Sequence, residues 1–157
     1  MKKAILMAMF SGFLTSCSSN QRIISRISDL GGKAEDCDRG VCVFLPDVLF
    51  ESGKSKLNGE VSEKVAEYGK VIQEEDQKSP IAIEGHTDSD GSDESNLKLS
   101  DKRSKRVKTL LEHGGLAKGR AATKAYGEAK PLVPNTSDAR KARNRRVEVV
   151  IENPSWF

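Results

Sequence analysis

The chain has 157 residues, of which 26 are Lys or Arg and 23 are Asp or Glu, giving a formal net charge of +3. A chain of this length is enough for one compact domain with short extensions. The small net charge gives no support for nucleic-acid binding, and the basic cluster in residues 140–146 has no interleaved aromatic side chain. We therefore expect no nucleic-acid partner.

Residues 1–16 have the composition of an export signal. Lys2 and Lys3 are followed by an apolar run at residues 4–14, which is the order of charged and apolar regions in signal peptides. The apolar run is too short to span a bilayer, which takes about 20 residues. We therefore predict that residues 1–16 are a signal peptide that is removed on export.

The end of this segment, Leu14-Thr15-Ser16-Cys17, resembles a bacterial lipobox. Such a motif implies that a lipid is attached to the Cys17 thiol, and that cleavage then makes Cys17 the new N-terminus. The alternatives are an ordinary secretory signal cut nearby and an uncleaved N-terminal anchor. By resemblance to lipoproteins of Gram-negative bacteria, the non-Asp residue Ser18 implies anchoring to the outer membrane, on its periplasmic face.

The segment after the signal is predicted to be a lipid-anchored tether, residues 17–40. Without the two signal lysines the chain keeps 24 of its 26 basic residues against 23 acidic ones, a net charge of +1. Within the tether Ile23, Ile24, Ile27 and Leu30 recur at helical spacing. The sequence does not decide whether this short amphipathic helix packs on the domain or lies near the membrane.

The remaining two cysteines, Cys37 and Cys42, are separated by a turn-forming stretch, residues 38–41. In an oxidising compartment a nearby pair of this kind favours a disulfide. Metal binding is the alternative, but no second Cys or His pair lies at the spacing of a zinc site. We predict a disulfide at the start of the globular part.

The globular domain is predicted to cover residues 41–152, followed by a C-terminal tail at 153–157. Runs rich in β-branched residues predict strands, and apolar residues at helical spacing predict helices. The expected strands are residues 41–45, 81–86, 122–126 and 147–151. The expected helices are residues 58–75, beginning at the N-cap Asn58, and residues 96–113, beginning near Asn96, with a helical turn at 137–143. This order predicts a two-layer α+β fold, a mixed sheet with helices on one face.

Polar residues concentrate where the second strand leads into the second helix. Asp88 follows the strand, and Asn96, Ser100 and Arg103 lie four and three residues apart, on one face of the helix. Each has an ordinary structural interpretation: a turn residue, a helix cap, a solvated arginine or a surface ion pair. A calcium loop around Asp88 is excluded because two of its ligand positions are not filled.

Taken together, these residues resemble the OmpA-like peptidoglycan-binding domain family, which includes the peptidoglycan-associated lipoprotein and the wall-binding part of flagellar stator proteins. The resemblance covers roughly residues 41–152. It rests on the following positions: Phe50-x-x-Gly53, Gly85-His86-Thr87-Asp88, Gly91, Asn96, Leu99-Ser100, Arg103, Val107 and Asn144-Arg145-Arg146-Val147-Glu148. One departure is Arg140-Lys141, where many members have Gly-Arg.

The resemblance implies that Asp88 and Arg103 bind diaminopimelate in the peptidoglycan stem peptide. The carboxylate would accept hydrogen bonds from the ammonium group of that side chain, and the guanidinium would bind its carboxylate through two parallel bonds. Further contacts are expected from Thr87, Asn96, Phe50, Leu99 and Arg145. Arg145 is preferred over Arg146 because alternation along the last strand sends them to opposite sides.

The resemblance thus implies a non-catalytic lipoprotein that ties the outer membrane to peptidoglycan, without a cofactor or a metal site. The alternative is an envelope signalling or assembly module that recognises a protein partner, for example of the Tol system. An enzyme hypothesis rests on His86 beside Glu84 and Asp88. It lacks a nucleophile motif and a complete set of metal ligands.

Overall fold

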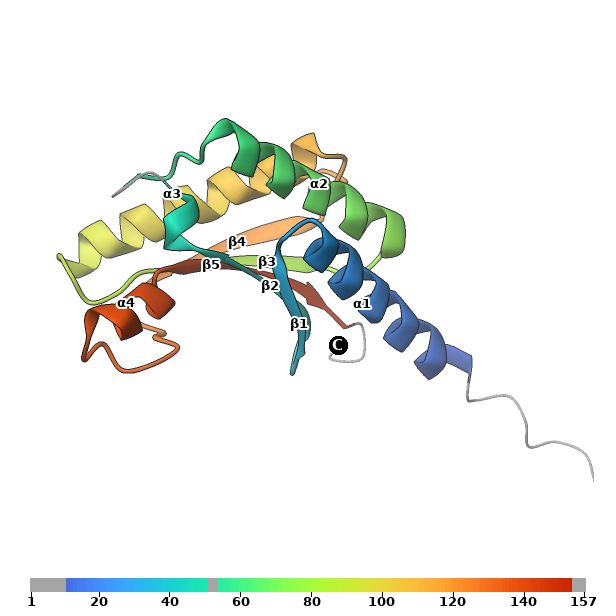
Figure 1. Ribbon diagram of the computed structural model, residues 1–157, viewed down its shortest axis with the longest axis horizontal. Helices are drawn as coiled ribbons and strands as arrows, with labels where there is room; N and C mark the ends of the chain where they lie inside the picture. Colours follow the sequence, from blue (N-terminus) through green and yellow to red (C-terminus); the bar gives the residue numbers. More distant parts are fainter. Residues whose placement is uncertain (1–10, 51–53, 154–157) are drawn as a thin grey trace, which may run out of the picture.

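The computed structural model describes residues 11–50 and 54–153, with side chains from residue 19 onward. A five-stranded sheet has the order β1-β2-β5-β3-β4 (Figure 1). Its strands are β1 (Lys33–Cys37), β2 (Gly40–Pro46), β3 (Ile81–His86), β4 (Ala121–Gly127) and β5 (Arg146–Glu152). Only β3 and β4 pair in parallel, whereas the other three neighbouring pairs are antiparallel. The sheet is therefore mixed, as predicted.

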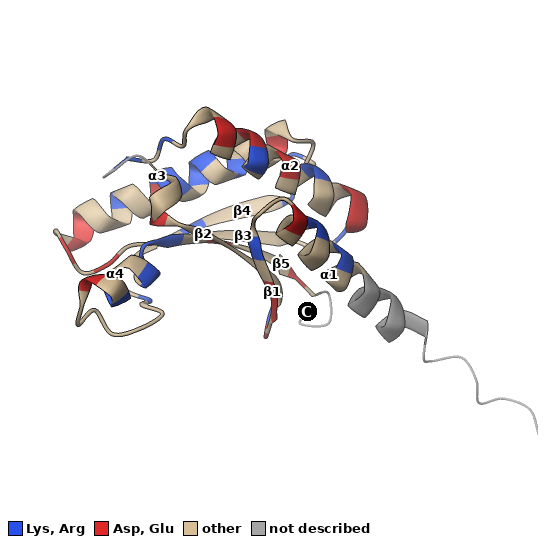
Figure 2. Cartoon of the chain, in the orientation of Figure 1, with Lys and Arg blue, Asp and Glu red and all other residues tan. Residues whose placement is uncertain are grey.

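Three long helices cover one face of this sheet: α1 (Ser11–Asp29), α2 (Gly59–Glu75) and α3 (Asp93–His113). The short helix α4 (Asp138–Asn144) lies at the end of the sheet on the other side (Figure 1). Alternate residues of β2, β3 and β5 point into the helix-covered core, for example Val43, Ile83 and Val149, each at most 1% exposed. Lys, Arg, Asp and Glu lie along the outer surfaces of the helices (Figure 2). The predicted α+β fold is confirmed.

Helix capping agrees with the prediction at α2 and differs at α3. Asn58 caps α2, since its Oδ1 accepts a hydrogen bond from Val61 N at 2.8 Å. At α3 the cap is Ser92, whose Oγ accepts from Ser95 N at 3.3 Å. The prediction that α3 begins near Asn96 was therefore wrong by about one turn. Acidic residues favour the first turn of a helix, and Asp93 and Glu94 extend α3 into what appeared from the sequence to be a loop.

The folded part begins earlier in the chain than residue 41. Ile23 and Ile27 of α1 are 0% exposed and belong to the main core, so α1 packs on the domain. Strand β1 pairs with β2 from Lys33 to Cys37, although its sequence is mostly charged. Such residues favour loops on their own, and only pairing with a neighbouring apolar strand makes them a strand. Residues 1–10 of the predicted signal and residues 154–157 of the predicted tail lie outside the described residues.

A disulfide crosses the β1–β2 hairpin. Cys37 and Cys42 are joined by a 2.09 Å S–S bond, with 5.9 Å between their Cα atoms. The turn between the two strands therefore brings the cysteines together, as the sequence predicts. No helix among the described residues has an apolar stretch long enough to cross a membrane.

The opposite face of the sheet carries a row of charged and polar side chains. They come from alternate positions of β3 and β5, namely Glu84, His86, Arg146 and Glu148. Burial, and then the nearby charge of Arg146, lowers the pKa of His86 to about 4. The His86 ring is therefore uncharged at neutral pH.

Candidate functional site

The loop after β3 holds Asp88 in a fixed position. Thr87 N donates a hydrogen bond to the Gly127 carbonyl at 2.8 Å, and the Thr87 hydroxyl donates to the Asp88 carbonyl at 3.0 Å. The same Asp88 carbonyl accepts from Asn96 Nδ2 at 3.2 Å. Its carboxylate Oδ1 accepts from the backbone N–H of Asp90 at 3.0 Å. Three of the predicted site residues thus form one connected loop-to-helix unit.

Arg103 lies about two turns into α3 and is 2% exposed. Its guanidinium lies 4.8 Å from the centre of the Phe50 ring, a cation–π distance. Nε donates to the Lys54 carbonyl at 3.0 Å, and Nη2 lies 2.5 Å from Asp47 Oδ1. Asp47 Oδ1 receives no aligned hydrogen bond from the described residues, so this last contact is an ion pair with poor alignment.

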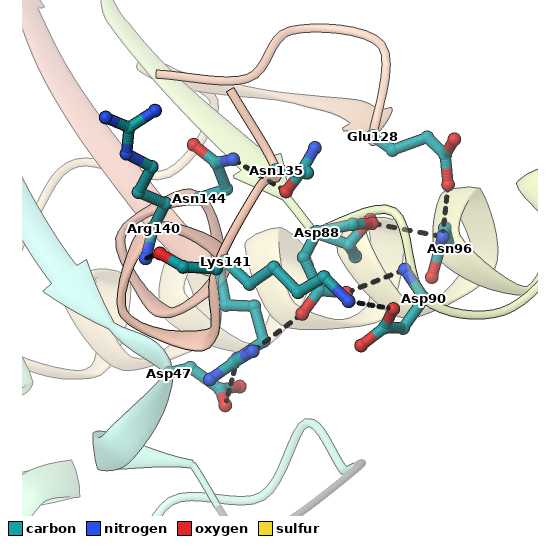
Figure 3. A network of polar contacts seen from close by, with 12 residues as sticks. Asp47, Asp88, Asp90, Asn96, Glu128, Asn135, Arg140, Lys141 and Asn144 are labelled. Carbon is teal, nitrogen blue, oxygen red and sulfur yellow. Dashed lines mark hydrogen bonds and ion pairs between the residues drawn. The ribbon is translucent and has the colours of Figure 1, made fainter. Parts of the chain in front are cut away.

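Arg145 connects the acidic and basic halves of the site. Nη1 donates to Asp88 Oδ2 at 2.6 Å, and Nε donates to Asp47 Oδ2 at 3.1 Å. Figure 3 labels the two carboxylates of this network, Asp47 after β2 and Asp88 in the loop after β3, with dashed lines for their contacts. Ion pairs thus run from Asp88 to Arg145, from Arg145 to Asp47, and from Asp47 to Arg103.

Asp88 and Arg103 therefore belong to one network, yet no direct ion pair joins them among the described residues. The network thus holds the guanidiniums of Arg103 and Arg145 together with the carboxylates of Asp47 and Asp88. The Arg103 guanidinium is thus already in contact with Asp47 and with the Lys54 carbonyl.

The position of Arg145 follows from the turn between α4 and β5. Arg145 is the C-cap of α4 with extended backbone angles, φ −72° and ψ 95°, and Arg146 begins β5. Arg146 points to the opposite face, where Nε donates to Glu148 at 2.6 Å. The alternation used to choose between the two arginines is thus present in the structure.

Asn144 fixes the loop that precedes this turn. It is 0% exposed, and its Oδ1 accepts from Leu132 N at 2.9 Å and from Val133 N at 3.0 Å. Its Nδ2 donates to the Val133 carbonyl at 2.7 Å and to Asn135 Oδ1 at 2.8 Å. Asn144 therefore places Arg145 without belonging to the ion-pair network.

Asp47 is the site residue that the sequence did not reveal. It follows Pro46 at the end of β2 and begins a 3-10 helix, Asp47–Leu49. Its N–H donates to the Arg145 carbonyl at 3.0 Å, and its carboxylate lies between Arg103 and Arg145. Arg145 is 98 residues away in the chain, so local pattern gave no signal. The only indication in the sequence was a carboxylate close after a strand, as at Asp88, which follows β3 by two residues.

The remaining predicted residues lie around this network. Asn96 Nδ2 also donates to Glu128 Oε2 at 2.7 Å, which ties α3 to the loop after β4. Leu99 is half-buried beside a groove of about 440 Å³. Four lysines line this groove: Lys54, Lys56, Lys98 and Lys102. The groove lies next to Arg103 because the Lys54 carbonyl accepts from that guanidinium.

The contacts of the site raise the pKa of two basic side chains, Arg145 and Lys141. Hydrogen bonding to Asp88 is the main reason why the pKa of Arg145 is raised above its usual value, with Asp47 adding to the effect and burial opposing it. A hydrogen bond from Lys141 to Asp90, 2.6 Å long, likewise raises the pKa of that lysine. The Arg145 guanidinium is therefore held in its charged form beside the carboxylates of Asp88 and Asp47.

Several known proteins that are similar to this chain in sequence are named as outer membrane proteins or lipoproteins. Outer membrane protein A of Bordetella avium is 37% identical over 112 residues, which cover 69% of this chain and 56% of that protein. The probable lipoprotein YiaD of Escherichia coli is 30% identical over 105 residues, 67% of this chain and 48% of that protein. A peptidoglycan-associated lipoprotein of Buchnera aphidicola is 36% identical over 72 residues, 46% of this chain and 42% of that protein. The chain spans less than two thirds of each of these relatives.

Solved structures share the same fold. A putative MotB-like protein from Desulfovibrio vulgaris superposes with a TM-score of 0.75 at 27% identity, over 89% of this chain and 95% of that one. The cell wall anchor of the T6SS from Pseudomonas aeruginosa superposes with a TM-score of 0.70 at 25% identity, over 84% of this chain and 96% of that one. Residues 49–145, more than half of the chain, match the OmpA family. The protein belongs to the OmpA family.

Proposed function

We propose that the protein is a non-catalytic wall-binding lipoprotein that recognises diaminopimelate-type peptidoglycan and ties the outer membrane to it. The observation that carries the proposal is the network in which Arg145 and Asp47 connect Asp88 to Arg103. The names of the relatives, which include a peptidoglycan-associated lipoprotein and a cell wall anchor, support it.

The end of the diaminopimelate side chain carries an ammonium and a carboxylate, and the network offers a partner for each. The ammonium binds Asp88, in place of one of the contacts made by Arg145. The ligand carboxylate binds the guanidiniums of Arg103 and Arg145, both of which now contact Asp47. Binding thus exchanges one carboxylate for another at the guanidiniums, so no buried positive charge is left without a partner.

The same geometry explains a preference over lysine-type stem peptides. A lysine side chain supplies the ammonium but no distal carboxylate. With lysine in the site, Asp47 stays on both guanidiniums and the ligand gains only the contact with Asp88. Discrimination therefore comes from the two-point bonding of the guanidiniums, which a single charge does not reproduce. The lysine-lined groove beside Leu99 adds attraction for the other carboxylates of the stem peptide.

The anchoring part of the proposal rests on Cys17. Ile23 is fixed in the core, and α1 extends from it through Cys17 toward the N-terminus. The six helical steps from Cys17 to Ile23 span about 9 Å. A lipid on Cys17 therefore holds the domain close to the membrane surface.

Co-sedimentation with purified diaminopimelate-type peptidoglycan tests the proposal. The wild-type chain is expected in the pellet, and Asp88→Asn in the supernatant, because the amide keeps the shape but loses the charge that binds the ammonium. The matched control is Asp93→Asn, an exposed aspartate of the first turn of α3, which is expected to sediment like the wild type. Equal sedimentation of wild type and Asp88→Asn would overturn the proposed site.

A further inference from the structure

Three side chains on the face of the sheet opposite the long helices converge on one point. Glu84 and His86 lie two residues apart on β3, and Glu148 on β5 is the direct cross-strand partner of Glu84. One ligand atom from each of the three lies within 4.8 Å of the other two. These residues take no part in the network around Asp88, because the alternation of the strands sends them to the other face.

His86 carries the strongest indication of a ligand. It is 2% exposed, and neither ring nitrogen has an aligned hydrogen-bond partner among the described residues. The ring stacks on Tyr126, with 5.2 Å between ring centres, which fixes its plane. The Lys130 backbone lies close enough to raise the pKa of His86, against the effect of burial, but it makes no aligned hydrogen bond with the ring. A buried polar group without a partner costs about 1–3 kcal/mol, so a native structure that keeps one calls for an explanation.

The carboxylates of Glu84 and Glu148, which face each other on neighbouring strands, are a second indication of a bound cation. Like charges directly opposite each other on neighbouring strands destabilise a sheet. Each is partly neutralised by an arginine: Arg39 Nη1 lies 2.8 Å from Glu84 Oε1, and Arg146 Nε lies 2.6 Å from Glu148 Oε1. Both arginines use Oε1, so Oε2 of each carboxylate remains for a further cation. Arg39 also binds Glu152, so three carboxylates share two guanidiniums and the cluster has a net charge of −1.

We propose that Glu84, His86 and Glu148 bind a divalent first-row transition-metal ion, with Zn²⁺ as the best fit. One imidazole nitrogen and two carboxylate oxygens are a ligand set that such ions accept. Water completes the coordination from the side of Glu148, whose side chain is 14% exposed. The ion would give the orphaned His86 nitrogen a partner and neutralise the opposed carboxylates, thereby joining β3 to β5. The site is independent of wall binding.

Zinc titration of the metal-free full chain, followed by calorimetry and by NMR of the histidine rings, tests this site. The chain has only two histidines, His86 and His113, and His113 is exposed at the end of α3. We expect one equivalent of Zn²⁺ to shift the His86 ring signals to saturation while the His113 signals stay unchanged. Glu148→Gln keeps the side-chain volume and the acceptor for Arg146. We expect this change to weaken zinc binding by more than about tenfold. Removal of a residue that only hydrogen-bonds to a metal ligand already costs at least about tenfold in affinity.

The controls separate this site from surface binding. Glu152→Gln changes a carboxylate that shares Arg39 but lies outside the three ligands, and it is expected to bind zinc like the wild type. His113→Ala is likewise expected to leave binding unchanged. The proposal is overturned by a zinc-dependent shift at His113 alone, by unchanged affinity in Glu148→Gln, or by no saturable binding. Glu148→Gln should still sediment with peptidoglycan. This result would show that the variant is folded and that the proposed metal site is separate from the proposed wall-binding site.

Discussion

Arg145 Nη1 donates to Asp88 Oδ2 at 2.6 Å, although the two residues are 57 positions apart in the chain. The contact closes the start of the last strand onto the loop after β3. The same guanidinium reaches Asp47 through Nε, so one residue orients both carboxylates of the site. The proposed binding surface is therefore built by three distant segments of the chain, and we expect its function to depend on the geometry of the guanidinium groups more than on their charge.

The first prediction concerns this dependence on geometry. Arg145→Lys keeps the positive charge, but an ammonium cannot reach Asp88 and Asp47 with the fixed fork of a guanidinium. We expect about a tenfold loss of affinity for diaminopimelate-type muropeptides, equivalent to about 1.4 kcal/mol. Titration calorimetry measures it. Arg143→Lys, an exposed position of α4, is the matched control and should bind like the wild type. Equal affinity of Arg145→Lys and Arg143→Lys would show that charge alone suffices.

The second prediction concerns Asp47, whose carboxylate occupies the position that we propose for the ligand carboxylate. Asp47→Asn leaves the buried Arg103 guanidinium without its counterion, so the free energy of unfolding should fall by roughly 2 kcal/mol, less than for a fully buried pair because Asp47 is partly exposed. The ligand carboxylate then restores the missing charge. We expect a saturating muropeptide to raise the melting temperature more in Asp47→Asn than in the wild type. A smaller ligand-induced rise in the variant would mean that Asp47 contacts the ligand instead of being replaced by it.

The third prediction tests whether α1 is part of the folded domain or only a tether. Ile27 is 0% exposed in the core, and Ile→Ala changes in a core cost about 2–5 kcal/mol. Ile27→Ala should therefore lower the free energy of unfolding by about that amount. Urea unfolding of chains that also carry Cys17→Ser, and so have no lipid, measures it. Ile24→Ala, a partly buried neighbour, is expected to cost less. A loss below about 0.5 kcal/mol at Ile27 would indicate that α1 does not stabilise the domain.

The fourth prediction is the pH dependence of Asp76 at the end of α2. Burial by itself would raise its pKa, but hydrogen bonds from Ser79 and from the Lys78 backbone, together with the charge of Arg120, lower it below the usual value. A carboxyl whose pKa is lower in the folded than in the unfolded chain stabilises the fold above the unfolded pKa, about 3.9. This contribution is lost as the pH falls through the folded value.

Asp76→Asn should accordingly be less stable than the wild type at pH 7, by about 1–2 kcal/mol. The difference should shrink toward pH 3, because the carboxyl of the unfolded chain becomes protonated below about pH 3.9. Urea unfolding of both proteins at pH 7 and pH 3 measures it. A deficit of the same size at both pH values would show that the charge of Asp76 contributes nothing.

Local patterns in the sequence predicted most of the fold. β-Branched runs marked β2, β3 and β5, and the apolar stripe through Val65, Tyr68 and Ile72 marked α2. Strand β1 escaped prediction because its five residues, Lys33–Cys37, form a strand only through pairing with β2. The start of α3 was misplaced because Ser92, Asp93 and Glu94 favour both loops and the first turn of a helix.

Residue spacing alone predicted the candidate site only where one short segment carries it, whereas Phe50 and Arg145 were predicted from the family resemblance. Asp88, Asn96 and Arg103 lie within one strand–loop–helix unit, and the spacing of Asn96, Ser100 and Arg103 indicated a shared helix face. The role of Asp47 was not visible, because both of its partners come from distant segments. The grouping of Glu84 and His86 with Glu148 was hidden for the same reason, since it depends on the register between β3 and β5.

The most direct test of the account compares two muropeptides that differ only in the third residue of the stem peptide, diaminopimelate or lysine. For the wild-type chain we predict at least about tenfold tighter binding of the diaminopimelate form, corresponding to about 1.4 kcal/mol from the extra carboxylate. In Arg103→Lys this preference should largely disappear while the fold is retained. Equal affinity of the wild-type chain for both muropeptides would contradict recognition of the zwitterionic side chain by Asp88 and the two arginines.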